Sequence, residues 1–268
     1  MSDRIIQAYY GEYPRINKRT PVDITARIMS DHGASLFEAI ADDCNLEPYG
    51  YKIGDYFESP TARSLLTQTG NSGTTQTVNV KLRYYIADLD TWYGGYNSYE
   101  VVDTHHVSIL VDSKVTRQWH SAADITNVGY NQSALYYYTI GGILTAIKAD
   151  MIELFGGSTG LEHLIQHQLY LTKTFATCEW TQTYIHTPSE FEVYGGNIFS
   201  GNDAQKYAFN KKLGLFDKYR FNQIYGNTPI WLCNMFSAAT ACAATDNGSA
   251  RNPSPVATYR ASGLILLH

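Results

Sequence analysis

Two histidines spaced four positions apart are the first residues whose types and spacing could do chemistry. On a helix, His163 and His167 would lie on one face, and that spacing can bind zinc. Glu162 precedes the pair, so the H-E-x-x-H order of a zinc protease is absent, and no third ligand lies nearby in the sequence. We therefore interpret the pair as polar residues that flank an apolar stripe.

A second group of possible ligands lies earlier in the chain. The adjacent residues His105 and His106 would face opposite sides of a strand, so they could not both bind one ion. Asp88 and Asp90 begin a D-x-D run, but the remaining ligands of a calcium loop, including the terminal Glu, do not follow. We expect no metal ion and no other cofactor.

Nucleophilic catalysis has two candidates. The run 156–160 matches the G-x-S-x-G pattern around Ser158, but that motif requires an entering strand, and the entering segment here has a helical pattern. Cys178 and His186 would form a thiol–imidazole pair only if the fold brought them together. The cysteines lack C-x-x-C spacing, which favours reduced and buried thiols; they are Cys44, Cys178, Cys233 and Cys242. We predict that the chain is not an enzyme.

Composition excludes further classes. The chain has 268 residues, 44% of them hydrophobic, and a net charge of −5, which weighs against a nucleic-acid surface. No apolar run approaches the roughly 20 residues of a membrane span, and the start Met1-Ser2-Asp3-Arg4 does not resemble a signal peptide, so we expect synthesis in a cytoplasm and no membrane partner. The 22 Tyr and 21 Gly fit a loop-rich β fold with surface tyrosines, an adaptable contact surface, or both.

Four segments have apolar residues at the spacing of a buried helix face. The best of them runs from Ile143 to Phe155 and is ended by Gly156-Gly157. Thr159 and Glu162 then have the spacing of a capping box, which predicts another helix after a tight turn. The predicted helices span 35–44, 143–155, 161–169 and 203–213.

Strand patterns accompany these helices. Residues 78–86 alternate between apolar and polar side chains, which predicts one strand with a buried face and an open face. Further strands are predicted at 107–111, 178–185, 230–235 and 263–267, and loops at 70–77 and 238–255. Strands and helices do not alternate regularly, so we predict an α+β fold with mainly antiparallel strands, a few helices and long loops.

Residues 1–33 have weak periodicity and are interrupted by prolines, which indicates an N-terminal arm ahead of a single domain at 34–268. The arm is either a disordered terminus or an anchor that docks on a neighbouring subunit. Its candidate anchor residues are Tyr9, Tyr10, Tyr13 and Arg15.

Several short motifs resemble, in their order along the chain, a family of uncharacterised domains found in bacterial surface proteins and phage virion proteins. In the first half they are Ile53-Gly54-Asp55, Tyr85-Ile86-Ala87-Asp88 and Asn131-Gln132-Ser133-Ala134-Leu135. In the second half they are Pro188-Ser189-Glu190-Phe191-Glu192-Val193-Tyr194-Gly195, Gln205-Lys206-Tyr207-Ala208-Phe209, Ile230-Trp231-Leu232-Cys233-Asn234, Ala241-Cys242 and Gly263-Leu264-Ile265-Leu266-Leu267. The resemblance covers residues 34–268.

The resemblance implies a C-type-lectin-like architecture, similar to the sulfatase-modifying-enzyme fold and to receptor-binding proteins of phages. The chain departs from the family at Cys233-Asn234, where the family often has Arg-Ser, and it lacks the calcium-binding tripeptides of sugar-binding lectins. The paired reactive cysteines of a sulfatase-modifying enzyme are also not provided by the spacing.

The expected function is therefore that of a phage virion structural protein. It would be a head-fibre, decoration or tail-associated subunit that assembles with sister subunits and other virion proteins. An alternative is a carbohydrate-binding adhesin that recognises a host-surface glycan, because planar rings stack on sugars. Outward contacts are predicted for the region 238–255 and for four aromatic residues: Trp92, Tyr93, Tyr96 and Tyr99.

Overall fold

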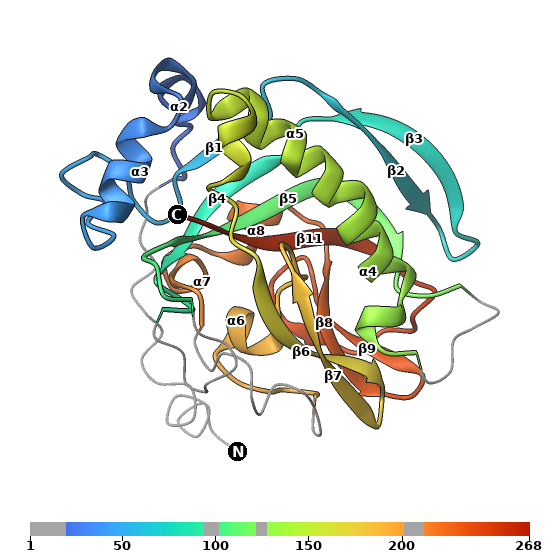
Figure 1. The fold of residues 1–268 in the computed structure, drawn as a ribbon. Coiled ribbons are helices and arrows are strands. Elements are labelled where there is room, and N and C mark those ends of the chain that lie inside the picture. Colours follow the sequence, from blue (N-terminus) through green and yellow to red (C-terminus); the bar gives the residue numbers. More distant parts are fainter. Residues whose placement is uncertain (1–19, 94–101, 122–127, 201–211) are drawn as a thin grey trace.

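The computed structural model describes residues 20–93, 102–121, 128–200 and 212–268 (Figure 1). Its centre is a seven-stranded sheet with the strand order β1-β4-β5-β11-β8-β9-β10. Neighbouring strands are antiparallel except β11 and β8, which are parallel. The strands are β1 Tyr56–Glu58, β4 Arg83–Leu89, β5 Val107–Gln118, β8 Ile230–Ser237, β9 Thr240–Ala244, β10 Ala250–Arg251 and β11 Thr258–Leu267. The predicted mixed α+β class with mainly antiparallel strands is confirmed.

Both faces of this sheet are buried. Successive residues of one strand enter different apolar clusters: Tyr84 packs into the larger cluster and Tyr85 into the smaller one, and both are buried. Trp231 and Leu232 divide in the same way on β8. A strand that is buried on both faces has a continuous apolar sequence without alternation, which is why the predicted strands at 230–235 and 263–267 lie where they were expected. The strand predicted at 107–111 from its alternating apolar residues is also present, as the start of β5.

A long helical segment covers one face of the sheet (Figure 1). It runs through α4 Ala134–Tyr138, the π-helical turn η2 Thr139–Ile143 and α5 Leu144–Leu154. Ser133 caps it by accepting a hydrogen bond from the Tyr136 N–H at 3.0 Å. The predicted helix at 143–155 is confirmed, and the segment extends beyond it toward the N-terminus. A short 3₁₀ turn, η1 Tyr130–Gln132, precedes Ser133.

Three short helices pack against the other face: α6 Glu190–Tyr194, α7 Gly214–Lys218 and α8 Phe221–Tyr225. The first begins with a capping box between Ser189 and Glu192. Glu190 is fully buried, and its carboxylate accepts hydrogen bonds from the N–H groups of Ile198 and Ser200, at 3.1 and 3.0 Å. The Pro188–Gly195 motif is therefore a structural corner. The helix predicted at 203–213 falls mostly outside the described residues.

Residues 20–33 pack on the domain. Helix α2 Thr25–Asp31 lies beside β1, and helix α3 Ala34–Ala41 packs against α2 (Figure 1). Ile24 and Ile28 are buried in the larger cluster, and the Ile24 N–H donates to the Tyr56 carbonyl at 2.8 Å. This part of the expected arm is thus folded against the sheet, while Tyr9, Tyr10, Tyr13 and Arg15 lie outside the described residues.

Two hairpins correct the predicted strands and helices. The alternating run 78–86 is divided between β3 Thr74–Val80 and β4, with a break at residues 81–82. β3 pairs with β2 Arg63–Thr69, so residues 74–77 form a strand where a loop was predicted. Both faces of β4 are buried, so the predicted open face is also wrong.

The helix predicted at 161–169 is wrong as well. A 3₁₀ turn, η3 Ser158–Leu161, is followed by β6 His167–Thr174, which pairs with β7 Thr177–Thr183. The backbone between them is bound to the sheet, since the Ile165 N–H donates to the Leu266 carbonyl at 3.0 Å. Pairing in the β6–β7 hairpin, together with the backbone contact to β11, outweighs the local capping pattern. The strand predicted at 178–185 corresponds to β7.

The loop predicted at 238–255 contains β9 and β10 instead. Residues Ala241 to Ala244 are buried in the sheet, so this part of the region cannot make outward contacts. Within the described ranges, none of the helices has the length and apolar character needed to cross a bilayer.

Candidate functional site

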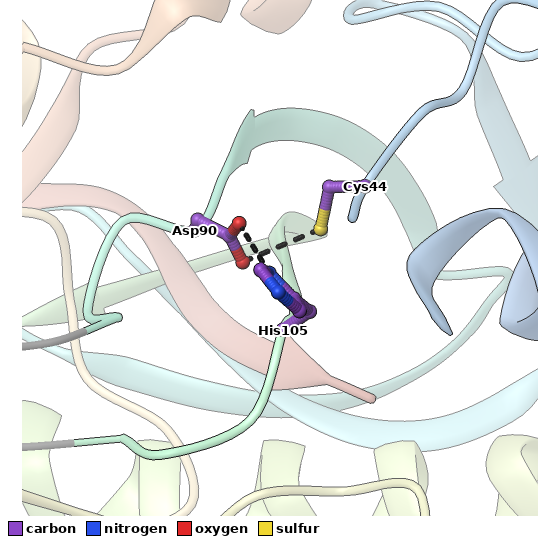
Figure 2. A group of neighbouring side chains, drawn as sticks. All are labelled: Cys44, Asp90 and His105. Atoms are coloured by element: carbon purple, nitrogen blue, oxygen red, sulfur yellow. Dashed lines mark hydrogen bonds and ion pairs between the residues drawn. The ribbon is translucent and has the colours of Figure 1, made fainter. Parts of the chain in front are cut away.

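Three side chains that can bind metal ions meet where β4 ends and β5 begins: Cys44, Asp90 and His105 (Figure 2). Asp90 directly follows β4, and His105 lies just before β5. Because β4 and β5 are antiparallel neighbours, with Leu89 opposite Val107, the end of one strand lies beside the start of the other. Cys44 comes from the turn that follows α3.

The three side chains are arranged around the Asp90 carboxylate. Its Oδ1 accepts from the Cys44 Sγ at 3.3 Å and from the His106 N–H at 2.9 Å. Its Oδ2 lies 2.7 Å from His105 Nδ1. One ligand atom from each of the three residues lies within 4.8 Å of the others. The carboxylate therefore has a fixed orientation, with one oxygen toward the thiol and the other toward the imidazole.

The backbone at this site is unusual. Asp43, Cys44 and Asp90 have φ angles of 51°, 56° and 48°, in the left-handed region that non-glycine residues rarely adopt. Residues held in such conformations concentrate at ligand-binding and active sites. The turn after α3 and the end of β4 are thus both held in conformations that local sequence preference does not favour.

The surroundings of Cys44 do not activate its thiol as a nucleophile. In the metal-free chain, burial and the neighbouring Asp90 carboxylate raise the pKa of the Cys44 thiol to about 12, so the thiol stays protonated at neutral pH unless an ion displaces the proton. A Cys–His pair requires the imidazole to accept the thiol proton, whereas Cys44 donates toward Asp90 and the His106 carbonyl. The hydrogen bond to Asp90 raises the pKa of His105.

The second nitrogen of His105 also has a carboxylate partner, because Nε2 lies 3.1 Å from Asp43 Oδ1. Tyr93 stacks on the His105 ring, with centroids 4.4 Å apart and planes inclined by 14°. Cys44 also lines a pocket of about 410 Å³. Tyr51, Lys52, Lys218 at the end of α7 and the following Tyr219 line it too. The cluster thus lies beside a surface hollow.

The predicted contact residues have different surroundings. Tyr93 is 46% exposed, as an outward contact requires, but Trp92 is only 1% exposed, so its prediction as an outward contact is wrong. The Trp92 N–H donates to His106 Nε2 at 3.0 Å, and its ring packs against His167 and His186. Tyr96 and Tyr99 lie outside the described residues.

The side chains of His105 and His106 point to different neighbours, as the sequence predicts. His105 faces two carboxylates, whereas His106 is buried between Trp92 and the Thr104 carbonyl. Asp88, the other half of the D-x-D run, accepts from the Gly214 N–H at 3.2 Å and takes no part in the cluster.

A buried chain of two histidines and a carboxylate lies beneath Trp92. His167 Nε2 is 3.2 Å from His186 Nδ1, and His186 Nε2 is 2.9 Å from Glu192 Oε1. His163 lies apart from this chain and stacks on Phe37, so the predicted pairing of His163 with His167 on one helix face is wrong. Burial alone would raise the pKa of Glu192, but His186 and Ser189 lower it below its ordinary value.

This buried chain predicts acid sensitivity. Burial first, and the neighbouring His186 second, lower the pKa of His167 from 6.5 to about 3. Between these two pH values the unfolded chain binds a proton that the folded chain does not, so stability falls as the pH decreases, by up to about 1.4 kcal/mol per pH unit. We expect His167→Gln to flatten this dependence in urea unfolding measured from pH 7 to pH 4. An unchanged slope would show that His167 is protonated in the folded state.

A second surface feature lies between β2 and the α4–η2 segment. It is a groove of about 640 Å³, with Leu66 and Tyr137 on its rim and Tyr138 and Gly141 in its lining. Leu66 is 45% exposed and Tyr137 is 64% exposed. Arg117 also lines the groove, with its guanidinium 4.2 Å from the centroid of the Tyr138 ring.

Arg117 lacks a carboxylate partner among the described residues, and its Nε is buried without a hydrogen-bond acceptor. Burial lowers the pKa of its guanidinium. The groove therefore combines exposed apolar and aromatic area with an uncompensated cation, which suits an apolar partner that brings a carboxylate.

The remaining candidates take structural positions. Ser158 lies in η3, preceded by a glycine turn rather than by a strand, so the nucleophile elbow is absent there. His186 is bound to His167 and Glu192, so its proposed pairing with Cys178 is replaced by these contacts. Cys44, Cys233 and Cys242 are buried thiols, as predicted, and Cys178 is partly exposed.

Sequence reasoning missed the Cys44–Asp90–His105 cluster. Asp90 and His105 were both recognised as possible ligands, and pairing of the two strands beside them would have joined them. No sequence signal links Cys44 to either residue, because its position depends on how α3 packs at the sheet edge. No protein-family model, curated protein or solved structure matches the chain.

Proposed function

We propose that this chain is a structural subunit of a phage virion, which assembles through the groove between β2 and the α4–η2 segment and turns over no substrate. The observation that carries the proposal is the groove itself, an apolar and aromatic hollow lined by Arg117, whose buried Nε has no hydrogen-bond acceptor among the described residues. The motif order described above supports the virion assignment and a C-type-lectin-like architecture. The mixed, mainly antiparallel sheet with helices on both faces is compatible with that architecture.

The buried polar groups support a role without catalysis. Among the described residues, six buried carboxylates could have been adapted for acid–base chemistry: Asp55, Asp88, Asp112, Asp150, Glu190 and Glu192. Each of them is hydrogen-bonded to neighbouring strands, helices or loops, as Asp112 is to Arg260 at 3.1 Å. These buried carboxylates join elements of the fold.

The groove favours a sister subunit as its occupant. Leu66 and Tyr137 present apolar and aromatic area, which drives association when it is buried. The chain carries a net charge of −5, so a second copy offers many carboxylates that can pair with Arg117. Closed symmetric assemblies of identical subunits are the commonest oligomers.

Gly141 provides a sharp test of this interface. A Cβ placed at Gly141 would have no atom within 4 Å, so Gly141→Lys should leave the monomer intact while it projects a long cation into the groove beside Arg117. We expect this variant to shift the oligomer toward monomer by at least tenfold in dissociation constant, measured by sedimentation velocity. Gly196→Lys is the matched control, since a Cβ there also has no atom within 4 Å.

Apolar truncation gives an independent comparison. Leu66→Ser removes rim area from the groove, whereas Val22→Ser removes a side chain of nearly equal exposure, 46%, beside α2. Leu66→Ser should weaken association and Val22→Ser should not. Equal behaviour of each groove variant and its control would contradict an interface at this groove.

A further inference from the structure

We propose that Cys44, Asp90 and His105 form a zinc site that joins the turn after α3 to the β4–β5 edge of the sheet. This inference goes beyond the proposed assembly role and does not depend on it. Its first support is the ligand set, since a thiolate, an imidazole and a carboxylate together are typical of Zn²⁺ and not of Mg²⁺ or Ca²⁺, which prefer oxygen ligands alone.

The ligand atoms lie within reach of one ion, because one atom from each residue lies within 4.8 Å of the others. With Zn–S of about 2.3 Å and Zn–N and Zn–O of about 2.0–2.1 Å, neighbouring ligands lie about 3.3–3.6 Å apart. Cys44 Sγ and Asp90 Oδ1 are already 3.3 Å apart. His105 Nδ1 lies 2.7 Å from the other oxygen, Oδ2, because a hydrogen bond joins them. Binding through a single carboxylate oxygen therefore requires the Asp90 carboxylate to rotate or the His105 ring to shift.

The surroundings hold the ligands as metal ligands are usually held. A zinc-binding histidine typically donates its other N–H to a carboxylate, and His105 Nε2 lies 3.1 Å from Asp43. The carboxylate ligand is also oriented from outside, because the His106 N–H bonds to Asp90 Oδ1 at 2.9 Å. Tyr93 covers one face of the His105 ring.

The three ligands come from separate parts of the chain, as in a site that links structural elements. Cys44 follows α3, Asp90 follows β4 and His105 lies before β5 (Figure 2). An ion there would bind the folded chain in preference to the unfolded chain, and so would raise its stability. Three protein ligands leave a fourth position for water or for another oxygen ligand.

The test uses the purified full chain, freed of metal with a chelator and titrated with Zn²⁺ or Co²⁺. We expect one equivalent to bind, a thiolate-to-Co²⁺ charge-transfer band in the near ultraviolet, and a rise in Tm of about 5 °C at a hundredfold excess of Zn²⁺ over the Kd. Cys44→Ser should abolish the band and weaken Zn²⁺ binding by about 100-fold or more. Cys178→Ser is the matched control and should retain both.

Further variants keep the test decisive if Cys44→Ser fails to fold. Asp90→Asn suits the left-handed backbone at this position and should also weaken binding about 100-fold, while Asp43→Asn should weaken it about tenfold by removing the partner of His105. His32→Asn, at an exposed histidine with a φ of 53°, is the control. A Co²⁺ spectrum without the charge-transfer band, or binding that survives both Cys44→Ser and Asp90→Asn, would overturn the zinc site.

Discussion

Replacing Asp150 with alanine should lower the free energy of unfolding by about 3–5 kcal/mol, because it breaks a buried ion pair and leaves its partners uncompensated. Asp150 is fully buried on α5. Its carboxylate accepts from Arg63 Nε at 2.7 Å and from Ser59 Oγ at 2.5 Å, and it also accepts from the Tyr84 hydroxyl. Burial raises the pKa of Asp150, although these three donors favour its ionised form.

The matched control is on the same helix and shares the same partner. Glu153 lies 3.1 Å from Arg63 Nη2, but its side chain is 37% exposed, so Glu153→Ala should cost less than about 1 kcal/mol. Urea unfolding followed by circular dichroism measures both variants. Equal losses would contradict the role of Asp150 as the buried centre of this network. Because Arg63 begins β2, Asp150→Ala should also disturb the hairpin that carries Leu66 to the groove.

Trp92→Ala should cost about 3–5 kcal/mol, as expected for truncation of a large buried aromatic side chain. Trp92 is among the largest fully buried side chains, and its ring contacts His167 and His186 at centroid distances of 5.6 and 5.9 Å. Thermal unfolding should show a decrease in Tm of about 5–9 °C for a chain of this length. Tyr93→Ala is the neighbouring control, and its exposed ring should cost less than about 1 kcal/mol.

This result bears on the carbohydrate-binding expectation. That expectation used Trp92 as a ring for stacking on a sugar, and a loss of glycan binding in Trp92→Ala would reflect unfolding instead. Trp180 on β7 is a better probe, because it is 38% exposed and lies beside Tyr170 with ring centroids 5.1 Å apart. A Trp92→Ala protein as stable as the unmodified chain would contradict the buried position of this ring.

The helices and strands that were predicted correctly are those whose structure follows from the residue pattern within the segment itself. Strands β8 and β11 were expected from continuous apolar runs, because a strand buried on both faces needs apolar side chains throughout. Helix α5 was expected from an apolar stripe that ends at Gly156-Gly157. In these segments the local pattern and the tertiary environment favour the same structure.

The errors arose where contacts between separate segments decide the structure and the periodicity of a single segment does not. The alternating pattern at 78–86 shows no sign of the break between β3 and β4. The break exists because β3 pairs with β2 whereas β4 pairs with β5. The capping pattern at Thr159 favours a helix, but β6 forms because β7 is available to pair with it. The Cys44–Asp90–His105 cluster depends on both kinds of contact, strand pairing and helix packing, and this is why the sequence indicated only two of its members separately.

Under the proposed virion role a phage encodes this chain, and quantitative mass spectrometry of purified particles of that phage, beside a lysate of the infected cells, tests the role most directly. We predict that the full chain is present in multiple copies per particle and stays bound after a high-salt wash. A chain that is abundant in the lysate and absent from the particles would contradict the proposal.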